Sequence, residues 1–93
     1  MSEEHSNFSK SVMITNELGL HARAAAKIAK LAIKAEEIIW IIKDSEKVDA
    51  SSIIDILTLG CSKGTKITFT TDNESDLDIL NDIVMLVEKG FGE

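Results

Sequence analysis

The chain has 93 residues, of which 44% are hydrophobic and 28% charged, with a formal net charge of −6. This is the size and composition of one soluble globular domain, spanning residues 1–93. The acidic balance excludes a general nucleic-acid binder, because such a surface repels the phosphate backbone.

Other classes are excluded by what the chain lacks. No apolar run reaches the roughly 18 residues that a membrane-spanning helix needs, and the acidic, polar start does not resemble a signal peptide. The single cysteine, Cys61, cannot form an internal disulfide, which favours a reducing compartment, so we expect a cytoplasmic protein. The spacing of histidines and cysteine matches no metal site, and no glycine-rich nucleotide loop is present, so we expect no metal and no cofactor.

The first half of the chain predicts a strand, a loop and a helix. Residues 1–7 are polar and are expected to form a mobile tail. Alternating apolar and polar residues predict a strand over 8–15, and a loop follows over 16–20. Helical spacing of Ala, Ile and Leu predicts a helix from Ala22 to about Lys34, with His21 as its N-cap.

The second half predicts a hairpin, two helices and a further strand. The apolar run 38–43 and the segment 47–50 predict paired strands around a turn at 44–46. Ser51 or Ser52 is expected to cap a short helix, and 65–71 alternates as a strand. Asp72 or Asn73 is expected to cap the last helix, which Gly90 ends. The order β-α-β-β-α-β-α predicts a two-layer α+β fold: a four-stranded, mostly antiparallel sheet with three helices on one face.

His21 carries the strongest chemical signal, in the segment Gly19–Arg23. The first backbone N–H groups of a helix have no partner within the helix and attract anions. A phosphoryl group on a ring nitrogen of His21 could therefore rest on the N–H groups of Ala22, Arg23 and Ala24, with the Arg23 guanidinium beside it. From this pattern alone, His21 could equally be no more than a helix cap.

Two separated segments resemble one known family. NELGLHARAAAK (16–27) closely resembles the active-site segment of HPr, the histidine-containing phosphocarrier of the phosphoenolpyruvate-dependent phosphotransferase system, and SIIDILTLG (52–60) is similar to its second signature. The resemblance runs from about Phe8 to the end of the chain. It implies an open-faced β-sandwich, a phosphoryl group received from enzyme I on Nδ1 of His21, and its transfer to a IIA-type protein.

The resemblance also implies roles for residues around the second segment. Ser52 matches a serine that a dedicated kinase phosphorylates in some HPr proteins, although a helix N-cap is its structural role. Ile53, Ile54 and Leu57, with Lys27, are expected to form a docking surface for protein partners. Core packing is the alternative for Ile56 and Leu57.

The run Ile38–Ile42 is apolar on both faces of its predicted strand. Counting back from Ser52 places Ile39 and Ile41 toward the helices and Ile38, Trp40 and Ile42 on the open face of the sheet. The last three residues are covered by neighbouring threonine methyls and lysine stems, or they form a patch for weak self-association of an otherwise monomeric protein or for a partner.

Three functions follow in order of preference: a sugar-system phosphocarrier, a regulatory paralogue such as the nitrogen-related branch, and a binding module that never carries phosphate. The ending Val87–Glu93 resembles C-termini of the regulatory branch. No second acid–base residue is evident near His21, which argues against a self-contained enzyme.

The sequence departs from the family at Ala24, where the family usually has proline. Alanine keeps a backbone N–H that proline lacks. We expect Ala24→Pro to change the phosphoryl-transfer rate by less than tenfold, about 1.4 kcal/mol of barrier. Transfer kinetics of the two proteins check this, and a change of several orders of magnitude would show that position 24 controls the chemistry.

Overall fold

The computed structural model describes residues 8–93, so the predicted tail at 1–7 lies outside the described part. The strands are β1 (Phe8–Met13), β2 (Trp40–Lys43), β3 (Glu46–Asp49) and β4 (Lys66–Thr71). The helices are α1 (Ala22–Ala32), α2 (Ile53–Thr58) and α3 (Leu77–Glu88), and single 3₁₀ turns lie at Glu74–Asp76 and Gly90–Gly92. The predicted element order is confirmed, with most boundaries shifted by one or two residues.

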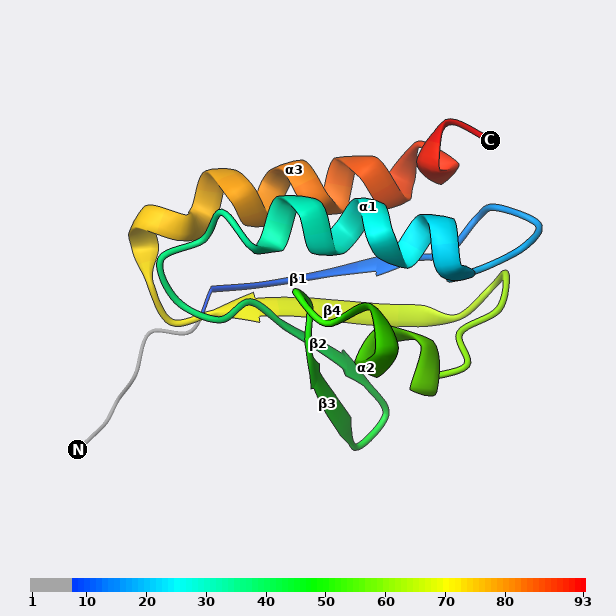
Figure 1. Cartoon of the computed structure of the whole chain (residues 1–93), viewed down its shortest axis with the longest axis horizontal. Helices are drawn as coiled ribbons and strands as arrows, with labels where there is room; N and C mark the ends of the chain where they lie inside the picture. Colours follow the sequence, from blue (N-terminus) through cyan, green and yellow to red (C-terminus); the bar gives the residue numbers. More distant parts are fainter. Residues whose placement is uncertain (1–7) are drawn as a thin grey trace.

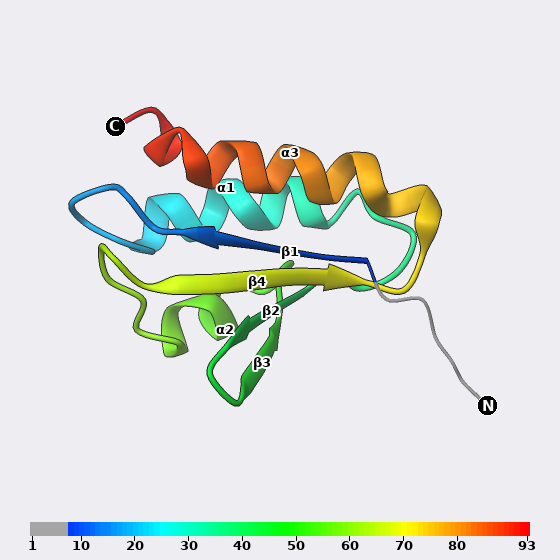
Figure 2. The ribbon, with the colours of Figure 1, turned by 180° about the vertical axis from the view of Figure 1, so that it is seen from behind.

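The four strands form one antiparallel sheet in the order β1-β4-β2-β3. Figures 1 and 2 show α1 and α3 side by side over β1 and β4. Alternate strand residues and the apolar faces of all three helices share one buried core, which includes Ile28 of α1, Ile56 of α2 and Ile83 of α3. The predicted two-layer open-faced sandwich is therefore confirmed.

The open face of the sheet is lined by polar rows that run across the strands. Ser9 of β1 donates to Thr70 of β4 at 2.9 Å, and the hydroxyls of Ser11 and Thr68 lie 2.8 Å apart. Trp40 of β2 lies opposite Thr70 of β4 on this face, whereas the next residue, Ile41, is fully buried. The predicted inward direction of Ile39 and Ile41 is thus confirmed. No helix in residues 8–93 has the length and apolar character to cross a membrane.

One buried carboxylate joins the start of α3 to the loop after α1. Asp76 is 1% exposed and accepts hydrogen bonds from the backbone N–H groups of Glu36 at 2.9 Å and Glu37 at 3.0 Å. Asn73 caps the 3₁₀ turn that precedes α3, which explains why α3 starts later than predicted. The carboxylate of Asp76 fixes the loop that leads from α1 into β2.

We expect Asp76→Ala to lower the free energy of unfolding by about 3 kcal/mol, because two backbone N–H groups lose the buried carboxylate that accepts from them. Urea denaturation measures the change. Asp82→Ala, which removes an exposed carboxylate from α3, is the matched control. Its free energy of unfolding should stay within about 0.5 kcal/mol of that of the unsubstituted protein. Equal losses in the two variants would contradict the role of the Asp76 contacts.

Candidate functional site

The loop before α1 is held against the segment after α2. Gly19 has φ of +65°, and a Cβ at this position would collide with the backbone carbonyl of Cys61, so a glycine is required there. The backbone N–H of Leu20 donates to the same carbonyl at 2.9 Å, and the Leu20 side chain is buried. These contacts set where α1 begins.

His21 is the N-cap of α1, as predicted, with extended backbone angles of φ −76° and ψ 176°. Its Nδ1 atom accepts a hydrogen bond from the backbone N–H of Arg23 at 3.2 Å. Ala22 and Arg23 are exposed beside it, and the side chain of Ala24 is fully buried in the core. A ring nitrogen of His21 therefore faces a backbone N–H group at the start of the helix, and the binding of an anion there stays a prediction.

Glu93 lies against the other ring nitrogen, and the expectation that no second acid–base residue stands near His21 is wrong. Oε2 of Glu93 is in hydrogen-bonding contact with Nε2 of His21, although the two residues are 72 positions apart. Oε1 accepts from the side-chain amide of Asn16 at 3.1 Å. Asn16 is itself buried, and its amide also donates to the carbonyl of Gly19 at 2.8 Å. Both side chains of the His21–Glu93 pair are about a quarter exposed, at 24% and 26%.

The segment Gly90–Glu93 brings this carboxylate to the histidine. Gly90, Phe91 and Gly92 all have positive φ, at 64°, 60° and 77°, so the chain turns back at the end of α3. The Phe91 side chain is buried in the core, and its carbonyl accepts from the Lys27 ammonium at 2.8 Å. In Figures 1 and 2 this segment lies at the same end of the molecule as the loop between β1 and α1. Lys27, predicted as a docking residue, thus also fixes the segment that carries Glu93.

Ser52 caps α2, as predicted, and accepts a hydrogen bond from the backbone N–H of Asp55 at 3.2 Å. Ile56 of this helix is buried, whereas Ile53, Ile54 and Leu57 are 41%, 74% and 40% exposed. The predicted docking residues therefore share an exposed apolar surface on α2, which packs against α1. Core packing does not account for Leu57.

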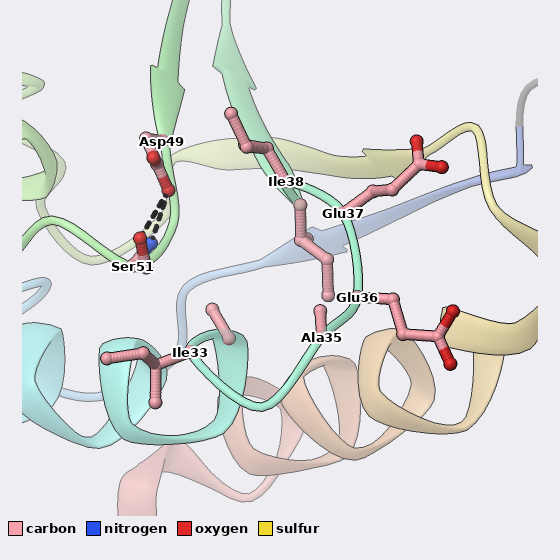
Figure 3. Close-up of a pocket in the computed structure, with 9 residues that line it drawn as sticks. Ile33, Ala35, Glu36, Glu37, Ile38, Asp49 and Ser51 are labelled. Carbon is pink, nitrogen blue, oxygen red and sulfur yellow. Dashed lines mark hydrogen bonds between the residues drawn. The ribbon is translucent and has the colours of Figure 1, made fainter.

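Of the three apolar residues predicted on the open face, Trp40 and Ile42 are half-buried. The Lys47 ammonium lies 4.7 Å from the centre of the Trp40 ring, while Ile38 is exposed. A shallow hollow of about 370 Å³ is lined by Glu37, Ile38, Trp40 and Asp72. A second hollow of about 200 Å³, shown in Figure 3, runs from Ile33 past Ile38 to Asp49 and Ser51. Neither hollow includes His21.

The fold and the capping histidine together define a class, the small phosphocarrier domains with an open-faced sandwich. A family model described as "PTS HPr component phosphorylation site" matches residues 8–89. The chain is 33% identical to the phosphocarrier protein HPr of Neisseria meningitidis, over 90% of this chain and 94% of that protein. It is 37% identical to the phosphocarrier protein NPr of Shewanella violacea, over 90% and 92%. A crystal structure of HPr from Thermoanaerobacter tengcongensis superimposes with a TM-score of 0.86 at 36% identity, covering 92% of this chain and 97% of that one. The chain belongs to the HPr family of phosphocarrier proteins.

The contact with His21 lowers the pKa of the Glu93 carboxyl, and the Asn16 amide acts in the same direction. A lowered pKa means that the contact stabilises the fold above the ordinary carboxyl range and that this contribution disappears as the pH falls through the lowered value. We expect the pKa of Glu93, followed by NMR of the side-chain carboxyl carbon, to rise toward its ordinary value in His21→Ala. An unchanged Glu93 titration in that variant would show that the pair does not form in solution.

Proposed function

We propose that this protein carries a phosphoryl group on Nδ1 of His21, receiving it from phosphorylated enzyme I and passing it to IIA-type proteins of the sugar phosphotransferase system. The observation that carries the proposal is the direction of the ring. Nδ1 faces the backbone N–H of Arg23 at the start of α1, where positive charge concentrates.

In this mechanism, phosphorus approaches Nδ1 along the direction now taken by the N–H of Arg23. That N–H group, with those of Ala22 and Ala24, then donates to phosphoryl oxygens. The exposed guanidinium of Arg23 can reach the same oxygens from the first turn of the helix. Positioning and charge stabilisation are the main contributions to phosphoryl transfer, and they need no cofactor on the carrier.

The donor and acceptor proteins would dock on α2. Ile53, Ile54 and Leu57 are exposed and apolar, and their helix packs beside α1, whose first residues hold the phosphoryl group. A small apolar surface of this kind suits brief encounters with successive partners. The protein would then act as a substrate and intermediate of phosphotransfer, without turning over a small molecule itself.

A regulatory branch is the second candidate. The chain is 37% identical to a relative named NPr and 33% identical to the HPr of Neisseria meningitidis. The ending Val87–Glu93 also resembles C-termini of the regulatory branch. In both candidates His21 carries the phosphoryl group, and they differ in the protein that receives it.

Ser52 is proposed as a regulatory phosphorylation site for an HPr kinase/phosphorylase. Phosphate at a helix N-terminus adds about −1.5 to −2 charge without breaking the helix. Because Ser52 directly precedes Ile53 and Ile54, the added charge would stand at the edge of the proposed docking surface and weaken partner binding.

Incubation with phosphoenolpyruvate and enzyme I, followed by intact-mass measurement, tests the proposal. We expect an acid-labile gain of one phosphoryl group, no gain in His21→Ala, and transfer at least tenfold slower in Arg23→Ala, which removes a charged phosphate contact. Lys34→Ala removes an exposed cation beyond the end of α1 and is the matched control.

Persistence of the phosphoryl group in His21→Ala would place it on another residue. No transfer from any donor would leave a non-phosphorylated binding module as the function. With transfer established, competition between sugar-system and nitrogen-system IIA proteins identifies the branch.

A further inference from the structure

Two hydrogen-bond donors converge on the Glu93 carboxylate. One is the buried amide of Asn16, whose NH₂ group points at Oε1 and also at the Gly19 carbonyl. The other donor is Nε2 of His21, which faces Oε2 of Glu93. A carboxylate accepts at both oxygens, and the contacts with His21 and Asn16 lower the pKa of Glu93.

The hydrogen bond at Nδ1 locates the ring proton. The backbone N–H of Arg23 can donate only to a nitrogen that carries a lone pair, so Nδ1 is unprotonated in this arrangement. The proton of the neutral ring must then be on Nε2, where it points at Glu93. Both contacts select the same tautomer from opposite sides of the ring.

We propose that Glu93 is a positioning residue that holds a proton on Nε2 of His21 throughout the phosphoryl-transfer cycle, which keeps Nδ1 as the acceptor. The proposal rests on His21 carrying the phosphoryl group. It adds to the proposed function a role for the Glu93 side chain, which determines at which nitrogen His21 reacts.

The transfer steps balance with that proton in place. The Nδ1 lone pair forms the N–P bond while the bond between phosphorus and the donor breaks, and its electron pair leaves with the donor. The ring then carries a positive charge, with the proton still on Nε2 and the Glu93 carboxylate beside it. In onward transfer the acceptor bonds to phosphorus, the N–P electrons return to Nδ1, and the neutral ring with Nε2–H is regenerated. A carboxylate next to Nε2 stabilises the charged ring in the same way as the carboxylate of a hydrolase triad.

The surroundings explain why the carboxylate stays in place. From α1, Lys27 binds the Phe91 carbonyl and adds positive charge near Glu93. From the loop after β1, Asn16 supplies a neutral donor. The buried Phe91 side chain anchors the segment between these groups.

Glu93→Gln provides a sharp test, because glutamine has nearly the same shape but only one acceptor oxygen. It cannot accept from Asn16 and from Nε2–H with the same orientation. When its NH₂ group faces His21, Nε2 must accept and the ring proton moves to Nδ1, opposite the N–H of Arg23. We therefore expect a mixture of tautomers and phosphoryl transfer slowed about tenfold, less than in a buried triad because this pair is partly exposed.

Long-range ¹H–¹⁵N spectra of histidine-labelled protein, at a pH where the ring is neutral, report which nitrogen carries the proton. His21→Ala distinguishes the His21 signals from those of His5. Glu88→Gln, which removes one exposed carboxylate from α3, is the matched control and should keep the original tautomer and rate.

A proton on Nδ1 in the unsubstituted protein would overturn the proposal, and so would an unchanged tautomer or an unchanged transfer rate in Glu93→Gln. The spectra need no phosphoryl donor. If the tautomer shifts as expected but no donor phosphorylates the unsubstituted protein, the phosphocarrier function fails while the contact between Glu93 and the ring proton stands; the proposed role in transfer then fails with that function.

Discussion

The functional end of this protein depends on one imidazole ring held between a helix N-terminus and a carboxylate. On one side, Nδ1 of His21 accepts from the first turn of α1, and on the other, Nε2 contacts Glu93. Neither contact would define the ring alone, because an exposed histidine rotates and changes tautomer readily. Together they fix its plane and distinguish its two nitrogens, which the proposed reaction at Nδ1 requires.

The rest of the fold keeps these two contacts together. The loop at Gly19 is pressed against the Cys61 carbonyl, which sets the start of α1, and Phe91 anchors the opposite contact in the core. Helices α1 and α3 lie side by side on the sheet, so the start of the first and the end of the second meet at one end of the molecule. Asp76 fixes the far end, where the loop after α1 passes the start of α3. Packing far from His21 thus helps to determine the positions of the two groups that contact its ring.

Local patterns in the sequence predicted most of this architecture but only half of the site. Alternation, helical spacing and the capping positions of His21 and Ser52 depend on neighbouring residues, and these predictions agree with the structure. Glu93 was missed because its contact joins positions 72 apart and depends on a left-handed turn that includes a non-glycine residue, Phe91. Two glycines flanking Phe91 were the available signal, since they allow the chain to reverse, but they do not indicate where the next side chain will point.

Under the proposed function, the placement of charge at this site resolves a conflict between the phosphoryl group and the carboxylate. A phosphoryl dianion near a carboxylate is unfavourable, yet the carboxylate stabilises the positive ring that forms when the N–P bond forms. In this structure the two anions would lie on opposite ring nitrogens, with the positive ring between them. The backbone N–H of Arg23 faces Nδ1, whereas Asn16 and Lys27 lie on the carboxylate side. Each anion would therefore have its own donors, and the positive charge of a phosphorylated ring would be attracted from both sides. Because the His21–Glu93 pair is partly open to water, these attractions stay modest, which suits the proposed role, in which the phosphoryl group must be released as readily as it is accepted.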